Sequence, residues 1–168
     1  MPRQNNINNG IYSDEWFTDI PTVVKVLKLF PCPKGATVMC PFDSDNSKFV
    51  YALRHLGHNV ICNITDFLEK DYEFDCIYTN PPFSIKDQVI ERCVASGKPC
   101  TLIMPMDCLG GVRRHSIYKN TKTKFFIPTR RISFYDSDGN KRVGAPHHSV
   151  FMQLNADENK VIFEYELN

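Results

Sequence analysis

Four consecutive residues, Asn80-Pro81-Pro82-Phe83, are suited to holding a flat molecule that carries an exocyclic amino group. Each proline fixes one φ angle and lacks an amide hydrogen, so the Pro81 carbonyl is held rigidly and this segment presents acceptors. The Asn80 side-chain oxygen and the Pro81 carbonyl can accept both N–H groups of one amine, while Phe83 stacks on the ring. These hydrogen bonds draw the nitrogen lone pair out of conjugation, so the nitrogen becomes a nucleophile without a strong general base.

The apolar run from Asp75 to Tyr78 precedes this motif and predicts a buried strand. Asn80 then stands at the carboxyl end of the strand, which is where ligands bind in an open α/β sheet. The alternative interpretation is a rigid proline turn without a ligand. Because proline fills only about 5% of positions in an average chain, a chance match is rare, and we adopt the ligand-binding hypothesis.

The remaining apolar patterns predict helices that alternate with short buried strands. Helices are expected over 18–30, 46–56 and 85–95, and further strands over 37–40, 59–62 and 99–104. Asp19 is the expected cap of the first helix, with Pro21 in its first turn, and Gly57 is expected to end the second helix. Strands that alternate with helices form a parallel sheet with right-handed crossovers.

Beyond Gly110 and Gly111 the pattern changes to strands joined by turns. These strands are predicted over 124–127, 131–135, 149–154 and 161–165, and they indicate an antiparallel edge on the parallel sheet. Residues 63–74 leave little room for another strand and helix, so we expect a trimmed sheet. The α/β domain is predicted to span 14–168, after a flexible, Asn-rich arm over 1–13.

Composition is that of one ordinary globular domain. The chain has 168 residues, of which 42% are hydrophobic and 23% charged, and no run approaches the 18 apolar residues of a membrane span. We therefore expect a cytoplasmic protein without membrane contact. The seven cysteines include no Cys-x-x-Cys pair and no histidine at ligand spacing, which predicts reduced thiols and no metal site.

The net charge of +1 conceals a basic segment. Residues 113–148 hold nine Lys and Arg against two Asp, whereas the segments on either side are acidic. Such a field suits phosphates, and interleaved phenylalanines and tyrosine could stack on bases. The alternative is a solvated basic face with the aromatic rings in the core. The candidate phosphate contacts are Arg113, Arg114, Lys122, Lys124, Arg130 and Arg131.

With these motifs in place, the chain resembles the Rossmann-like, S-adenosylmethionine-dependent adenine-N6 methyltransferases, in particular the short phage and prophage DNA enzymes. In that family Asn-Pro-Pro-aromatic is the catalytic motif, so the resemblance implies catalytic roles for Asn80, Pro81, Pro82 and Phe83 on a flipped-out adenine. It also implies a Rossmann-like methyltransferase fold. The stretch from Arg131 to Phe134, the Asp-Gly turn and the stretch from His148 to Phe151 resemble the final hairpin of these enzymes.

The same resemblance suggests where the cofactor S-adenosylmethionine binds. Trp16, Phe17 and Thr18 resemble the segment beside its methionine end, and Asp66-Phe67 resembles the pair at its adenine end. The loop after the first strand resembles the cofactor loop, and its candidate contacts are Asp43, Ser44 and Asp45.

This loop departs from the family in two ways. Cys40 stands where an acidic residue is expected, and Ser44, Asp45 and Asn46 stand near the usual glycine positions. The acidic residue usually found after the second strand is also missing, with Asn63 in its neighbourhood. Asp43 or Asp45 could serve instead, but Asp45 and Asn46 could equally cap the next helix.

The sequence thus predicts a DNA adenine-N6 methyltransferase, with three alternatives. The same active site serves RNA adenine and, usually with Tyr as the aromatic, protein glutamine. A degenerate domain that only binds nucleic acid or a protein partner is the non-enzyme alternative. The order of the motifs predicts no separate recognition domain, so we expect target selection to come from loops, from residues 1–13 or from a protein partner.

Overall fold

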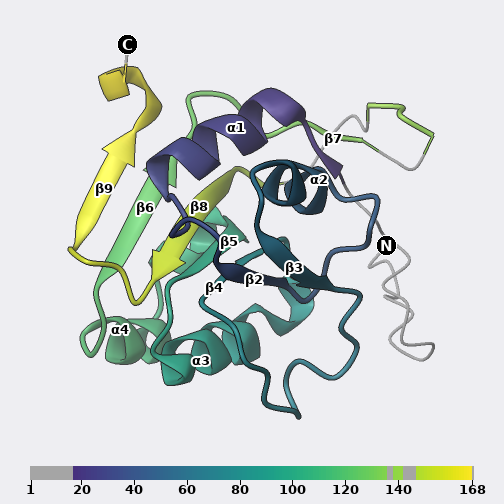
Figure 1. The fold of residues 1–168 in the computed structure, drawn as a ribbon. Coiled ribbons are helices and arrows are strands. Elements are labelled where there is room, and N and C mark those ends of the chain that lie inside the picture. The colour runs from purple at the N-terminus through teal and green to yellow at the C-terminus, as the bar shows by residue number, and fades with distance from the viewer. Residues whose placement is uncertain (1–16, 136–137, 142–146, 168) are drawn as a thin grey trace.

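The computed structural model describes residues 17–135, 138–141 and 147–167 (Figure 1). The predicted arm over 1–13 and Trp16 lie outside these residues. Seven strands form one sheet, and two short strands pair separately. Their bounds are β1 Phe17–Thr18, β2 Thr37–Cys40, β3 Asn59–Cys62, β4 Cys76–Thr79, β5 Cys100–Pro105, β6 Thr123–Ile127, β7 Phe134–Tyr135, β8 Ser149–Leu154 and β9 Lys160–Phe163.

The main sheet has the strand order β3-β2-β4-β5-β8-β6-β9. β2, β3, β4 and β5 are mutually parallel, β8 runs antiparallel between β5 and β6, and β9 is parallel to β6. The predicted mostly parallel α/β sheet with an antiparallel edge is confirmed, with β8 as the antiparallel strand on that side of the sheet. β6 therefore runs in the same direction as β4 and β5, so the carboxyl ends of these strands lie along one edge of the sheet.

Helices cover both faces of this sheet. In Figure 1, α1 (Ile20–Leu29) and α2 (Lys48–His55) lie on one face, and α3 (Lys86–Ser96) and α4 (Val112–Tyr118) on the other. Alternate residues of β4 feed the two cores, since Tyr78 packs with the α1 and α2 side and Ile77 with the α3 side. This alternation leaves the strand buried throughout, which explains its continuous apolar run.

The helix ends follow the predicted signals with one correction. Asp19 caps α1, because its carboxylate accepts hydrogen bonds from the Thr22 amide and hydroxyl, and Pro21 lies in the first turn. Gly57 follows α2 with a φ of 85°, as expected of a glycine stop. The cap residue of α2 is Ser47, so the interpretation of Asp45 and Asn46 as its cap is wrong.

The chain after β5 departs most from the predicted pattern. Residues 131–135, predicted as a strand, do not join the main sheet. Only the last two of them, β7, form a strand, and it pairs with β1. β8 pairs antiparallel with β5 and with β6, and not with residues 131–135. Residues 112–118 form α4, which the sequence did not predict because this helix buries no residue and Val112 is 93% exposed. The trimmed sheet is confirmed, because residues 63–75 contain no helix or strand.

Candidate active site

The Asn80 motif lies at the point where the strand order reverses. From β2 the chain moves outward to β3, whereas from β4 it moves the other way to β5. β2 and β4 are neighbours, so the loops that follow them meet at the carboxyl edge of the sheet. In open α/β sheets, ligands bind in the crevice at this switch point.

The Asp43 carboxylate joins the two loops. Its Oδ2 accepts a hydrogen bond of 2.6 Å from the Thr79 hydroxyl and one of 3.4 Å from the Asn80 amide. Its Oδ1 accepts one of 2.7 Å from the Ser47 hydroxyl at the start of α2. The Phe42 amide in turn donates to the Thr79 Oγ1 at 3.2 Å. A half-buried carboxylate thus fixes the backbone at the first residue of the motif.

The Asn80 motif is partly buried and leads directly into helical structure. Pro81 is buried, and Asn80, Pro82 and Phe83 are half-buried. A 3-10 turn over Phe83–Ile85 follows and leads directly into α3. The Asn80 side chain makes no hydrogen bond within the described residues, so its amide remains available to a ligand.

A second carboxylate of the loop after β2, that of Asp45, lies beside the end of β3. Asp45 accepts hydrogen bonds of 2.8 Å from Arg54 and 2.9 Å from the Asn63 side chain, and its side chain is 63% exposed. Arg54, followed by Asn63, lowers the pKa of Asp45, which keeps this carboxylate charged. Asn63 adopts a left-handed φ of 59°, and its amide donates to the Asp43 carbonyl at 2.9 Å. A carboxylate from the loop after β2 therefore lies beside Asn63, the residue that follows β3.

Asp66 and Phe67 lie in the segment after β3. The half-buried Asp66 carboxylate accepts a hydrogen bond from the Tyr72 hydroxyl, which raises the pKa of Tyr72. Phe67 is buried and packs edge-on against Phe42, with ring centroids 5.6 Å apart. The loops after β2 and β3 are thus joined by an aromatic contact.

The other predicted cofactor contacts have different surroundings. Ser44 lies in the loop before α2, where its hydroxyl accepts from the Asn46 amide at 3.4 Å. Thr18 is buried, and the backbone of Phe17 pairs with Tyr135. Phe17 and Thr18 directly precede α1. The start of this helix lines a cavity together with residues that follow β6, so Phe17 and Thr18 lie at the carboxyl edge of the sheet.

Solved structures with this arrangement include several methyltransferases. The chain matches a predicted O-methyltransferase from Agrobacterium tumefaciens with a TM-score of 0.52 and 8% identity, covering 80% of each chain. A candidate RNA methyltransferase from Pyrococcus horikoshii matches with a TM-score of 0.51 and 12% identity, covering 86% of each chain. The 23S rRNA methyltransferase ErmE matches with a TM-score of 0.55 and 11% identity, covering 85% of this chain and 71% of that chain. The chain has a Rossmann-like methyltransferase fold.

Sequence comparison adds nothing to this likeness of fold. No protein-family model matches the chain, and no match is found among curated proteins. The shared features are the mixed sheet and its flanking helices, as the resemblance of the Asn80 motif implied.

The six basic residues predicted to contact phosphates are spread over this methyltransferase fold. Arg113 pairs with Glu91, and Arg114 with Asp87. The other four lie between α4 and β8. Lys122 donates to the Asp157 carbonyl, and Lys124 forms ion pairs with Asp157 and Glu158. Arg130 and Arg131 follow β6 and are exposed. Phe126 and Phe134, two of the interleaved rings, are buried in the core.

Arg114 fastens α4 to the rest of the methyltransferase fold. Its guanidinium donates to the Asp87 carboxylate at 2.6 Å and to the carbonyls of Asp107 and Gly110, and only 16% of the side chain is exposed. Arg113, one residue earlier, is 69% exposed and contacts Glu91. The two neighbouring arginines therefore allow a direct comparison of a mostly buried ion pair with an exposed one.

Arg114→Ala is expected to destabilise the protein by about 1.5 kcal/mol, because it removes charge-assisted hydrogen bonds to three acceptors. Arg113→Ala should cost less than ~0.5 kcal/mol, as usual for an exposed ion pair. Urea unfolding measures both. Arg114 lowers the pKa of Asp87, so its contribution is present at neutral pH and declines as the pH falls through that lowered value. Equal losses for both variants would contradict this assignment.

Several supporting residues escaped the sequence analysis. Thr79 is 1% exposed and carries the hydroxyl that connects Asp43, in the loop after β2, to the end of β4. Its signal was a polar residue at the last position of an apolar strand, next to Asn80. Arg54 and Tyr72, which hold Asp45 and Asp66, carried no local signal because their partners are remote or lie across a turn.

No helix of the described residues is long and apolar enough to cross a membrane. Within the same residues, no group of three His, Cys, Asp or Glu side chains is placed to hold a metal ion.

Proposed function

We propose that this protein is an S-adenosylmethionine-dependent methyltransferase that acts on the exocyclic N6 amine of a flipped-out adenine in DNA. The observation that carries the proposal is the position of Asn80, which follows β4 at the switch point and whose backbone is held by the Asp43 carboxylate at 3.4 Å. The fold, which several solved methyltransferases share, supports it.

The chain's own groups account for activation of the amine. The Asn80 side-chain oxygen and the rigid Pro81 carbonyl accept the two N–H groups, and the Phe83 ring stacks on the base. S-adenosylmethionine, when bound, would supply an electrophilic methyl group on a sulfonium sulfur, and this sulfur would keep the electron pair of the broken carbon–sulfur bond as a neutral thioether. As the amine nitrogen forms its new bond to carbon, it becomes cationic and then loses one proton to solvent. Asn80 and Pro81 stabilise the positive charge that develops on this nitrogen.

The residues at the carboxyl edge fit the cofactor in their donor set. Both aspartates accept hydrogen bonds from the protein, but Asp43 is half-buried whereas Asp45 is 63% exposed. We therefore assign Asp43 to positioning and Asp45 to the ribose hydroxyls or the ammonium group. Ser44 lies beside it, and Asp66-Phe67 would flank the adenine end. Trp16, Phe17 and Thr18 would flank the methionine end. Among the described non-glycine residues only Asn63 and Asn155 have a positive φ, so the loop over 41–47 forms without glycine geometry.

A methyl-transfer assay tests the proposal directly. The protein is incubated with methyl-labelled S-adenosylmethionine and, in separate reactions, with DNA, RNA and a protein mixture. Label in N6-methyladenine of DNA supports the proposal. Label in RNA or in glutamine would assign the same site to the alternative substrates, and a calorimetric titration without cofactor binding at millimolar concentration would favour a degenerate domain.

A nucleic acid would extend along the carboxyl edge from Asn80. The end of β5 is tied to the residue before β8 by a 2.8 Å hydrogen bond from the Met106 amide to the His148 carbonyl, and the His148 ring contacts the Pro128 carbonyl at 2.9 Å. Arg130 follows Pro128. Three strand spacings separate β4 from β6, so Arg130 lies roughly 14 Å along this edge from Asn80. That distance is about four base pairs of duplex DNA.

Arg130→Ala is expected to weaken DNA binding about equally for all sequences, because the exposed Arg130 makes no ion pair within the described residues and is free to contact a phosphate. The slope of log affinity against log salt should flatten by about one unit. Lys34→Ala, which removes an exposed charge before β2 at the opposite edge, is the control and should leave the slope unchanged. Equal slopes for Arg130→Ala and the unmodified protein would remove Arg130 from the interface.

Target selection and location belong to the same proposal. Sequence selectivity would come from the loops of the carboxyl edge, from residues 1–13 or from a protein partner. The protein would work in the cytoplasm of a bacterial or phage-infected cell.

A further inference from the structure

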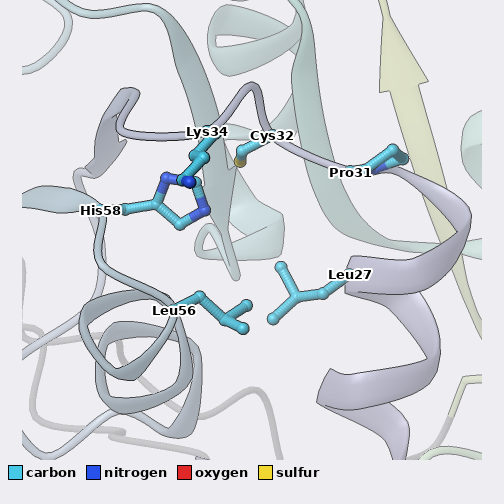
Figure 2. Close-up of a pocket in the computed structure, with 6 residues that line it drawn as sticks. All are labelled: Leu27, Pro31, Cys32, Lys34, Leu56 and His58. Atoms are coloured by element: carbon cyan, nitrogen blue, oxygen red, sulfur yellow. The ribbon is translucent and has the colours of Figure 1, made fainter.

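A cavity of about 250 Å³ lies at the edge of the sheet opposite the candidate active site. It is formed where the loop between α1 and β2 meets the end of α2. Figure 2 shows Leu27 and Leu56 pointing toward each other on one side of the cavity, with Cys32, Lys34 and His58 on the other. The buried Nδ1 of His58 has no hydrogen-bond partner within the described residues. The cavity is therefore lined by apolar side chains, a thiol and an imidazole.

Cys32 stands between this cavity and a second thiol. Its Sγ lies 3.0 Å from the Sγ of Cys76, the first residue of β4. Cys32 is half-buried and lines the cavity, whereas Cys76 is 3% exposed and lies behind it. A small reagent in the cavity thus reaches Cys32 first and has Cys76 directly beyond it.

The two thiols differ in acidity. The hydrogen bond with Cys76 lowers the pKa of Cys32 below its ordinary value despite partial burial. The same contact, together with burial, raises the pKa of Cys76. The lowered pKa raises the fraction of Cys32 that is thiolate, which is the nucleophilic form of cysteine.

The remaining cysteines lack this combination. Burial raises the pKa of the fully buried Cys40 and Cys108 and of the half-buried Cys62. Cys93 and Cys100 lie near each other but are completely buried. Only Cys32 combines a lowered pKa, contact with a cavity and a neighbouring thiol.

We propose that Cys32 and Cys76 are a peroxide-sensitive thiol pair that oxidises to an intramolecular disulfide. The Cys32 thiolate attacks one oxygen of hydrogen peroxide, the O–O bond breaks, and the departing hydroxide takes up a proton to become water. Cys32 is now a sulfenic acid. The Cys76 sulfur attacks the Cys32 sulfur, an S–S bond forms, and the S–O bond breaks, with the thiol proton leaving in a second water. Two thiols are oxidised by two electrons, and one peroxide is reduced to two waters.

Peptide mapping tests this pair independently of methyl transfer. The reduced full-length protein is freed of reductant, treated with a few equivalents of hydrogen peroxide, alkylated and digested with trypsin. Peptide 29–34 contains Cys32 as its one cysteine, and peptide 71–86 contains Cys76 as its one cysteine. We expect a linked ion of these two peptides, lighter than their sum by two hydrogen atoms and lost on reduction. Cys32 should be consumed at least about tenfold faster than Cys62.

Variants and stability complete the test. Cys32→Ser, at the half-buried position, should abolish the linked ion, while Cys62→Ser should retain it. The disulfide closes a loop from residue 32 to residue 76, so oxidation should raise the Tm of the unmodified protein by about 5 °C or more and leave that of Cys32→Ser unchanged. Oxidation of Cys32 to sulfinic acid beside a free Cys76 thiol would overturn the proposal. A disulfide between Cys32 and any other cysteine, or between two chains, would also overturn it.

Discussion

Asn80→Ala is expected to lower the rate of methyl transfer at least about a hundredfold while the protein stays folded. Loss of one well-placed acceptor in a desolvated site costs on the order of 3 kcal/mol in the transition state. The hydrogen bond that Asp43 accepts comes from the backbone amide of residue 80, which alanine retains. Because the Asn80 side chain has no hydrogen bond within the described residues, stability should change by less than ~0.5 kcal/mol. Single-turnover methyl transfer and urea unfolding measure the two quantities.

Phe83 provides the control for this result. Phe83→Ala should weaken capture of the extruded base, whereas Phe83→Tyr should be mild because stacking needs a ring face and not a particular ring. Binding of S-adenosylmethionine, followed by calorimetry, should be unchanged in all three variants. Retained activity in Asn80→Ala would refute the proposed mechanism. Equal damage from both Phe83 variants would mark this ring as a packing residue.

Asp43→Asn is expected to reduce both stability and activity, because the carboxylate holds the loop after β2 to the end of β4. In the unmodified protein, the hydroxyls of Thr79 and Ser47 both donate to the Asp43 carboxylate. The substitution places an amide nitrogen, which is itself a donor, against one of these two hydroxyls. Thr79 is almost fully buried, so its lost hydrogen bond is not replaced by water. The expected loss is about 2 kcal/mol of unfolding free energy, measured in urea. Methyl transfer should fall with it, since Asn80 loses its backbone anchor.

Asp45→Asn is the matched control, since Asp45 is two residues away in the same loop but largely exposed. It should leave the unfolding free energy unchanged within error and weaken S-adenosylmethionine binding, because its carboxylate is assigned to the cofactor. The converse pattern, with Asp45→Asn destabilising and Asp43→Asn silent, would reverse the two roles. Loss of cofactor binding in Asp43→Asn without loss of stability would return Asp43 to the set of direct contacts.

The elements that local sequence patterns control could be predicted well. β2, β3 and β8 have the predicted bounds or lie within one residue of them, and α1 begins at the predicted Asp19 cap. These elements follow from side-chain periodicity and from backbone chemistry within a few residues, both of which a sequence displays directly. For the same reason the position of Asn80 after a buried strand was predictable, since it requires only an apolar run and two prolines.

Other features depended on contacts that no local pattern encodes. α4 exists because Arg114 reaches Asp87 on α3 and the Tyr118 hydroxyl donates to the Cys108 carbonyl, not because its own sequence has an apolar face. β7 leaves the main sheet because its partner is β1, far away at the start of the chain. Propensity is a weak guide wherever tertiary contacts of this kind decide the outcome.

By itself, the sequence determined which groups stand at the end of the buried strand β4: an amide, a rigid carbonyl and a ring. The tertiary structure alone decided which hydrogen-bond donors each of the two carboxylates after β2 contacts. Asp43 turns inward to Thr79 and Ser47, while Asp45 turns outward to Arg54 and Asn63. Both are aspartates in one short loop, and either could accept the same hydrogen bonds. The strand order sets which donors each one meets, because it brings the ends of β2, β3 and β4 together.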